Sequence, residues 1–137
     1  MAAGIGGKAM LIAQMTDIHI GCAPDARPEE LNRTRFRATL DRLLAQPNRV
    51  DMLVLSGDLT DHGDIDSFLK TAELLKDCPF PVHAMVGNHD SREGLLAAFP
   101  DTPVAEGGFL HRAFVADGLL VVLLDSFEPG RHGGAFC

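Results

Sequence analysis

The stretch MLVLSGDLTDHG, residues 52–63, joins an apolar run directly to a loop rich in acidic side chains. Residues 52–55 have the length and composition of a buried strand. The loop that follows carries Gly57, Asp58 and Asp61. In open α/β sheets, functional groups gather where loops leave the carboxyl ends of parallel strands. The stretch therefore predicts a buried strand whose exit loop carries the chemistry of the protein.

Two other stretches are built in the same way. The apolar run 10–15 leads into Thr16-Asp17-Ile18-His19, and the run 82–86 leads into Gly87-Asn88-His89-Asp90. Both runs read as short strands. Adjacent parallel strands end at the same edge of a sheet, so we expect the three exit loops to converge on one spot.

Amphipathic stretches separate the three predicted strands. We expect helices over residues 28–46, 64–75 and 91–98, with Asp64 and Ser91 as N-caps of the second and third. The apolar stripe of the second helix is expected to consist of Ile65, Phe68, Leu69, Ala72 and Leu75. This alternation of strands and helices predicts an α/β fold with parallel strands.

The pattern changes after residue 100. Residues 109–116 and 119–124 flank Asp117-Gly118, a dipeptide that strongly favours a two-residue hairpin turn. The second arm, LLVVLL, is apolar on both faces. We therefore expect this arm to be a central strand that is covered on both sides. For Arg92, just after the third loop, the sequence leaves open a surface salt bridge or a contact with a substrate phosphate.

Two Asp, one Asn and two His at one spot indicate a divalent metal site. Carboxylate, amide and imidazole groups are ligands of hard and borderline cations, and carboxylates packed closely would repel each other without one. Asp17 and His19 can reach one ion from a single extended exit turn. Asp58 has two oxygens and could bridge two ions, while Asn88 offers a neutral oxygen. His89, next in the chain, is placed to face a substrate.

The three motifs, in this order, resemble the calcineurin-like metallophosphoesterase superfamily, whose pattern begins D-x-H, G-D-x-x-D/N and G-N-H-D/E. The stretches LIAQMTDIHIG and GDLTDHG look most like the bacterial class III cyclic-nucleotide phosphodiesterases and their glycerophosphodiesterase relatives. The resemblance implies the amino-terminal part of an α/β/β/α sandwich and two divalent ions, which could be Mn, Fe, Zn or Co.

Site roles follow from the same resemblance, position by position. It implies that Asp17 and His19 bind the first ion, that Asp58 bridges both, and that Asn88 binds the second. His89 would be the catalytic residue beside the leaving-group oxygen. Asp61 and Asp90 are expected to support these residues or to shape turns. The implied substrate is a small phosphodiester: a cyclic nucleotide, a glycerophosphodiester or another phosphoester.

The family pattern continues with a later His and a closing G-H-x-H, which this sequence lacks. We expect His111 and His132 to have structural roles instead. The sequence thus predicts an extension over residues 1–9 that is disordered and an incomplete phosphoesterase domain over residues 10–137. Two expectations follow from this: poor or no hydrolysis of bis(p-nitrophenyl) phosphate with Mn, and self-association through the uncovered apolar strand.

Composition limits the other classes of function. The net charge of -7 argues against a nucleic-acid platform, which needs a basic face. Three cysteines without a CxxC pair, no signal peptide and no long apolar run predict a reduced, cytoplasmic chain outside the membrane. The alternative to an enzyme is a non-catalytic metal-binding or scaffold protein on the same fold. A nucleotide-binding module is a weaker option, because no glycine-rich phosphate loop follows the first strand.

Overall fold

Three parallel strands form the central sheet of the computed structural model, which describes residues 9–22 and 30–136. They are β1 (Ile12–Met15), β2 (Met52–Leu55) and β3 (Val82–Ala84), paired in the order β1-β2-β3. Ile12 pairs with Met52, and Leu53 pairs with Val82. The structure therefore confirms three adjacent parallel strands at the predicted positions, and β2, with two neighbours, is the central one.

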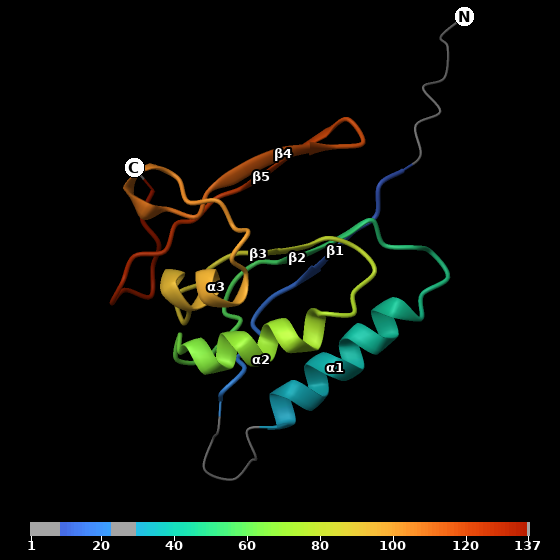
Figure 1. Ribbon diagram of the computed structural model, residues 1–137, viewed down its shortest axis with the longest axis horizontal. Helices are drawn as coiled ribbons and strands as arrows, with labels where there is room; N and C mark the ends of the chain where they lie inside the picture. Colours follow the sequence, from blue (N-terminus) through green and yellow to red (C-terminus); the bar gives the residue numbers. More distant parts are fainter. Residues whose placement is uncertain (1–8, 23–29, 137) are drawn as a thin grey trace, which may run out of the picture.

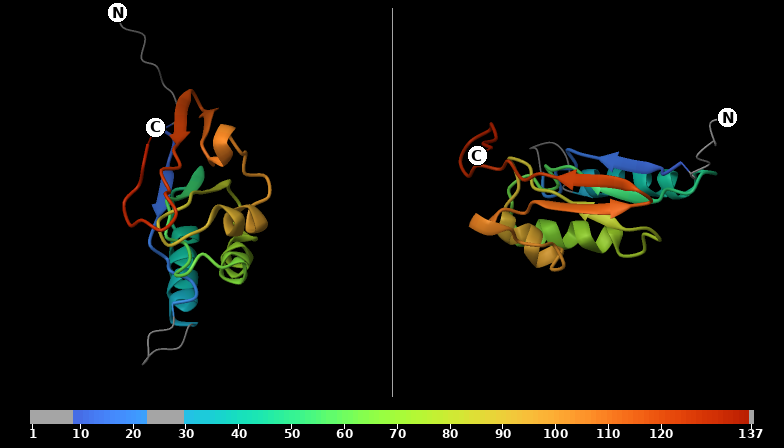
Figure 2. Two further views of the ribbon diagram at one scale, coloured as in Figure 1. Left: turned by 90° about the vertical axis from the view of Figure 1, so that its left-hand side faces the viewer. Right: turned by 90° about the horizontal axis from the view of Figure 1, so that it is seen from above.

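Helices cover one face of this sheet. Figures 1 and 2 show α1 (Glu30–Leu44) and α2 (Ile65–Leu75) below it, with α3 (Arg92–Ala98) packed beside α2. The core between helices and sheet is built from large apolar side chains, among them Phe36, Leu40, Leu53, Leu55, Phe68 and Leu95. In the described part of the chain, no helix combines the length and the apolar character that a membrane crossing requires.

Some sequence predictions fall outside the described residues. These are the extension over residues 1–8, the start of the first helix at residues 28–29, and Cys137. Within the described ranges α1 ends at Leu44, just before the helix-breaking Pro47. Cys22 and Cys78 form no disulfide in the described part of the chain.

Both predicted helix caps are present. The Asp64 carboxylate accepts a hydrogen bond from the N–H of Ser67 at 2.9 Å. The Ser91 hydroxyl accepts one from the N–H of Gly94 at 3.0 Å. Each cap satisfies a backbone donor that the first helical turn leaves without a partner. The strand-exit loops therefore pass into α2 and α3 at fixed points.

The predicted apolar stripe of α2 is partly wrong. Phe68 and Leu75 are buried as expected, but Ile65 and Leu69 are 41% and 49% exposed. The buried face instead runs through Phe68, Thr71 and Leu75, spaced three and four residues apart. The helix is rotated so that the hydroxyl of Thr71, bonded to the Ser67 carbonyl at 2.9 Å, takes a core position without an unpaired polar group.

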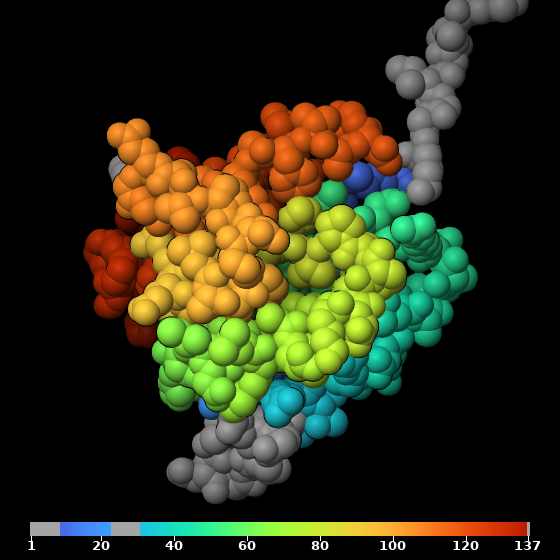
Figure 3. Space-filling model, in the orientation of Figure 1, coloured from blue at the N-terminus to red at the C-terminus, as the bar shows by residue number. Residues whose placement is uncertain are grey.

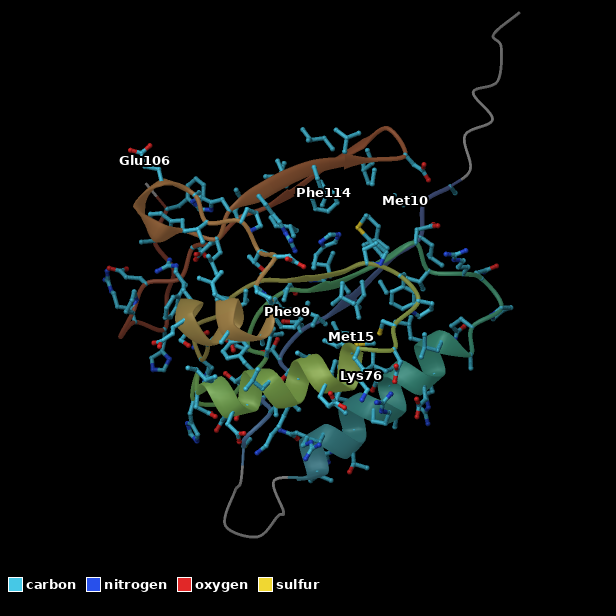
Figure 4. The ribbon with its side chains drawn as sticks, in the orientation of Figure 1. Met10, Met15, Lys76, Phe99, Glu106 and Phe114 are labelled. Atoms are coloured by element: carbon cyan, nitrogen blue, oxygen red, sulfur yellow. The ribbon has the colours of Figure 1, made fainter. Side chains whose placement is uncertain are left out.

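A hairpin lies on the other face of the sheet. It consists of β4 (Arg112–Ala116) and β5 (Leu119–Leu123), which are antiparallel, with Ala116 opposite Leu119. Asp117 and Gly118 form the predicted turn, both with positive φ (47° and 80°), as a type I′ turn requires. Figure 4 shows Phe114 pointing from β4 toward the sheet, where its ring lies 4.4 Å from that of His83.

The outer face of the hairpin contradicts the expectation of a strand covered on both sides. In the described residues β5 pairs with β4 alone, and the hairpin forms the upper surface in Figure 3. Val115 and Leu120, directly opposite each other, are 70% and 63% exposed, and Val122 is exposed beside them. An apolar run on both faces of a strand shows that both faces can be buried, but it does not identify what buries them.

An ion pair with a buried carboxylate links the base of the hairpin to α3. Asp125 is 3% exposed, and Arg92 donates to both of its oxygens, at 2.6 and 3.0 Å. The N–H groups of Leu110 and Phe127 also donate to this carboxylate, each at 2.9 Å. Arg92 thus forms a salt bridge, as one of the two sequence alternatives had it, with a partner that is buried. Burial raises the pKa of Asp125, yet the bonds from Arg92, Leu110 and Phe127 outweigh this effect and leave the pKa below its usual value.

We predict that Asp125→Asn destabilises the fold and makes its free energy of unfolding less dependent on pH in the acidic range. The folded-state pKa of Asp125 lies below the unfolded one, so its stabilising contribution is complete above about pH 4 and is lost as the pH falls further. Removing one partner of a buried pair costs about 3 kcal/mol. Urea unfolding of both proteins from pH 7 to pH 3 measures this. Asp66→Asn, at an exposed pair with Lys70, is the control. Parallel stability curves for wild type and Asp125→Asn would contradict the prediction.

We also predict that Val115→Lys reduces self-association of the chain. A lysine at the centre of the exposed apolar face of the hairpin opposes contact between two such faces. Sedimentation velocity over a range of concentrations is the measurement, and Ala38→Lys on the exposed side of α1 adds the same charge elsewhere. A wild-type chain that stays monomeric at every concentration would refute the expectation.

Candidate metal centre

The exit loops of β1 and β2 run side by side beyond the ends of the strands. The N–H groups of His19 and Ile20 donate to the carbonyls of Asp58 and Leu59 at 3.0 and 2.9 Å. A further bridge pairs Ile20 with Thr60. The parallel pairing of β1 and β2 therefore continues through the residues that were predicted to carry the chemistry, and the predicted convergence of these loops is confirmed.

A buried carboxylate joins the third loop to the second. Asp90, 5% exposed, accepts hydrogen bonds from the N–H groups of Leu59, Thr60 and Gly87 at 2.9–3.1 Å, and from the Thr60 hydroxyl at 2.9 Å. Burial raises its pKa, although these bonds act in the opposite direction. Both oxygens are already in use, so Asp90 shapes the loops and is not placed to bind an ion.

Three of the predicted ligands have left-handed backbone. Asp17, His19 and Asp58 have φ values of 55°, 49° and 51°. Such a conformation costs roughly 1–2 kcal/mol for a residue with a side chain. The expectation that Asp17 and His19 share an extended turn is therefore wrong. With left-handed backbone at both positions, the side chains of Asp17 and His19 reach the same point beside Asp58.

Asp17, His19 and Asp58 form a group of donors at that point. His19 Nε2 lies 3.9 Å from Asp17 Oδ1 and 4.0 Å from Asp58 Oδ2. One ligand atom from each of the three residues falls within 4.8 Å of the other two. These separations are too long for hydrogen bonds, but they suit atoms that surround one cation at about 2 Å.

The second ring nitrogen of His19 is already engaged. Its Nδ1 lies 3.0 Å from Asp61 Oδ1. A carboxylate can only accept a hydrogen bond, so Nδ1 carries a proton, and in the neutral ring the lone pair is on Nε2, the atom that faces Asp17 and Asp58. Metal-bound histidines are commonly oriented in this way by a carboxylate behind the ring. These contacts fit the supporting role predicted for Asp61.

His89 stands beside His19 at the edge of this group. Its Nδ1 lies 3.0 Å from the carbonyl of Asp61, and its backbone N–H donates to Asp58 Oδ1 at 3.1 Å. The two imidazole rings meet edge to face, with centroids 4.7 Å apart. The hydrogen bond to the Asp61 carbonyl raises the pKa of His89, and the charges of Asp58, Asp61 and Asp90 add to this.

Sequence reasoning missed a second possible set of ligands. Ligand atoms of His19, Asp61 and His89 also lie within 4.8 Å of one another. Asp61 is the last residue of the G-D-x-x-D motif, so its position in that motif was the available signal. However, Nδ1 of His19 lies at the Asp61 carboxylate and Nδ1 of His89 lies at the Asp61 carbonyl, so these nitrogens are already used in hydrogen bonds within the set.

Close packing of two glycines leaves the space that the site needs. A Cβ on Gly87 would lie 2.2 Å from Asp58 Oδ1 and 2.3 Å from its backbone nitrogen. A Cβ on Gly57 would lie 2.9 Å from the Cα of Gly87. Two carboxylates, an imidazole with a free lone pair and room between the loops fit a divalent cation.

Asn88 is less closely joined to this group. It is exposed, and it lines a cavity of about 270 Å³ on the β3 side of Asp58, together with Ser56 and Gly87. The other two histidines noted in the sequence lie away from the ligands. His111 Nδ1 accepts from the N–H of Asp125 at 2.9 Å, and its ring stacks on Phe109. His132 lies on the wall of the same cavity as Asn88.

Comparisons with known proteins agree with these observations. The family model described as calcineurin-like phosphoesterase matches residues 10–130. A "3',5'-cyclic adenosine monophosphate phosphodiesterase" of Pseudomonas aeruginosa is 29% identical over 91% of this chain and 44% of its own length. A "cAMP/cGMP dual specificity phosphodiesterase" of Mycobacterium tuberculosis is 33% identical over 73% of this chain and 32% of its own. A "Probable cyclic nucleotide phosphodiesterase" of Synechococcus is 30% identical over 98% of this chain and 51% of its own. The chain thus spans between about a third and about half of the length of these relatives.

We predict that Gly87→Ala lowers the affinity for Mn²⁺ at least tenfold. The new methyl group would displace the Asp58 carboxylate, and overpacking of this kind also costs about 1–3 kcal/mol of stability. Calorimetric titration with Mn²⁺ and thermal unfolding measure the two effects. Gly133→Ala is the control, because its Cβ would meet no atom within 4 Å. Equal Mn²⁺ affinity in Gly87→Ala and wild type would argue against a site built around Asp58.

Proposed function

Because the chain belongs to the calcineurin-like phosphoesterase family, we propose that it serves the metal-dependent hydrolysis of a small phosphodiester, with a cyclic nucleotide as the substrate. The observation that carries this proposal is the meeting of Asp17, His19 and Asp58 within 4.8 Å at the sheet edge. The names of the relatives support the choice of substrate class. Glycerophosphodiesters remain the second class that the motifs allow.

The proposed site holds two divalent ions. Asp17, His19 and Asp58 would bind the first ion, and Asp58 and Asn88 the second; Mn, Fe, Zn and Co all suit these ligands. Such ions lower the pKa of a bound water and neutralise charge on phosphoryl oxygens. The chain contributes the fixed orientation of its donors: Asp61 holds the His19 ring, and the glycine contact holds Asp58.

We assign proton donation to His89. The Asp61 carbonyl accepts from Nδ1, so the ring is held with Nε2 directed away from that carbonyl. When the bond between phosphorus and the leaving oxygen breaks, Nε2–H can give its proton to that oxygen, while a water oxygen forms the new bond to phosphorus. The proton that leaves His89 is replaced by one from the attacking water.

Left-handed backbone at three donors favours a protein that binds metal over a scaffold that does not. A protein that used the fold only as a scaffold would gain stability by relaxing these residues.

Two expectations rest on the sequence alone and stay predictions: a cytoplasmic location, and the absence of a nucleic-acid platform.

We predict that Asp58→Asn reduces the stabilisation by metal to about half of the wild-type value or less. A ligand present at 100 times its dissociation constant stabilises the folded state by about 2.7 kcal/mol. Wild type should show this gain with Mn²⁺, and Asp58→Asn should show less than a tenth of the wild-type affinity. Thermal unfolding with and without a chelator is the measurement, with Asp66→Asn as the matched control on α2.

Hydrolysis separates the enzyme from a metal-binding scaffold. With Mn²⁺ and bis(p-nitrophenyl) phosphate, His89→Gln should keep the wild-type affinity for Mn²⁺ and lose at least about 100-fold in turnover, the range for a general acid. A wild type that binds Mn²⁺ and releases p-nitrophenol at a rate that His89→Gln does not reach would rule out the scaffold alternative. A wild type that binds no Mn²⁺ would refute the proposed function.

A further inference from the structure

The hairpin of β4 and β5 is attached outside the main core. The core cluster is built mainly between the sheet and the helices, and among the described residues none of its members comes from β4 or β5. Figures 1 and 2 show the hairpin as a separate layer that extends over the sheet from a base near α3. At that base the pair of Arg92 and Asp125 links it to α3. The hairpin can therefore move away from the sheet about its base without opening the core.

Along its length the hairpin meets the sheet at His83. The rings of His83 and Phe114 lie 4.4 Å apart, with an angle of 36° between their planes. His83 faces the hairpin because side chains alternate along a strand, and its two neighbours in β3 belong to the core on the helix side. Val54, which pairs with His83, and Val121, opposite Phe114, share these faces and carry no charge. A titratable ring therefore lies between two layers of the fold.

This interface offers no acceptor to a charged His83. Among the described residues, Nδ1 of His83 is buried and has no hydrogen-bond partner. The neutral ring can carry its single proton on Nε2, whereas the protonated ring carries a proton on both nitrogens. Protonation in the docked state would therefore bury a positive charge together with a donor that has no acceptor, and both are unfavourable.

Arg112 of β4 makes protonation of His83 still less favourable. In the described part of the chain its guanidinium has neither an ion pair nor a hydrogen bond. Asp101 lies on the wall of the same cavity of about 230 Å³ but does not pair with it. Burial lowers the pKa of His83, and the positive charge of Arg112 lowers it further. The docked hairpin thus favours the neutral ring.

We propose that docking of the hairpin on the sheet is sensitive to pH: the hairpin lies on the sheet while His83 is neutral, and it is released when His83 takes up a proton. The released ring can donate both protons to water. Below the ordinary pKa of 6.5 the released form binds more protons than the docked form, so docking weakens as the pH falls. The pair at the base of the hairpin persists in this range, because Asp125 loses its charge only below about pH 4.

Hydrogen–deuterium exchange of the hairpin, measured by mass spectrometry without added metal, tests this inference. A two-stranded hairpin alone is marginally stable in water, so the amides of residues 112–123 exchange faster once the hairpin leaves the sheet. After correction for intrinsic exchange, wild type should lose about threefold to tenfold in protection between about pH 7.5 and about pH 5.5, since the lower value lies one unit below the ordinary pKa of His83. Residues 52–55 of β2 should change by less than about twofold.

Three variants separate His83 from other sources of pH dependence. His83→Phe keeps a ring against Phe114 that cannot be protonated, so its hairpin should keep its protection within about twofold over this range. Arg112→Gln removes the neighbouring charge and raises the pKa of His83 toward its ordinary value, so the loss should be smaller than in wild type. His62→Gln changes a histidine whose side chain is 72% exposed, and it should behave as wild type.

A wild-type hairpin that keeps its protection at acidic pH would overturn this inference, and so would equal losses in His83→Phe and wild type. Equal losses in the hairpin and in β2 would also overturn it, because they indicate opening of the whole fold. If His83→Phe does not fold, an unchanged pH dependence in Arg112→Gln would count against it in the same way. The proposed function would stand in each case, since the experiment uses neither metal nor substrate.

Discussion

The buried carboxylate of Asp90 is the interaction on which the arrangement of the site depends. It binds backbone donors of the loops after β2 and β3, so it fixes the distance between the residues that these loops carry. Without it, the N–H groups of Leu59, Thr60 and Gly87 would be left in the interior without acceptors, at about 1–3 kcal/mol each. Asp90 takes no part in the proposed chemistry, but it positions Asp58 and His89 together with the direct hydrogen bond from the His89 N–H to Asp58 Oδ1.

A second level of organisation connects the site to the hairpin. Arg92 begins α3 immediately after the third loop, and its ion pair with Asp125 fixes the base of the hairpin. The same arginine holds the Phe127 carbonyl, from which the carboxyl-terminal loop departs. The segment that carries His132 and the loop that carries Asn88 and His89 are thus both joined to Arg92 within a few residues.

Much of this fold could be predicted from local signals in the sequence. The strands followed from short apolar runs, the caps from Asp64 and Ser91, and the turn from Asp117-Gly118, because each depends on neighbours within a few residues. The meeting of Asp17, His19 and Asp58 could be predicted because parallel pairing needs no detail beyond strand order. The rotation of α2 could not, since Ile65 and Leu69 are as apolar as the residues that are buried. The solvent-exposed outer face of the hairpin and the contact of His89 with the Asp61 carbonyl depend on tertiary packing, which no pattern in the sequence records.

The left-handed backbone at Asp17, His19 and Asp58 has a consequence for how this protein can change. Glycine adopts positive φ without steric penalty, so replacing any of the three by glycine would relieve strain while it deletes a donor. Substitutions at these positions that remove ion binding can therefore raise the folding stability of the chain above that of the present sequence. A selection for thermal tolerance alone would tend to erode the centre, whereas a selection that retains the ion would preserve the strain.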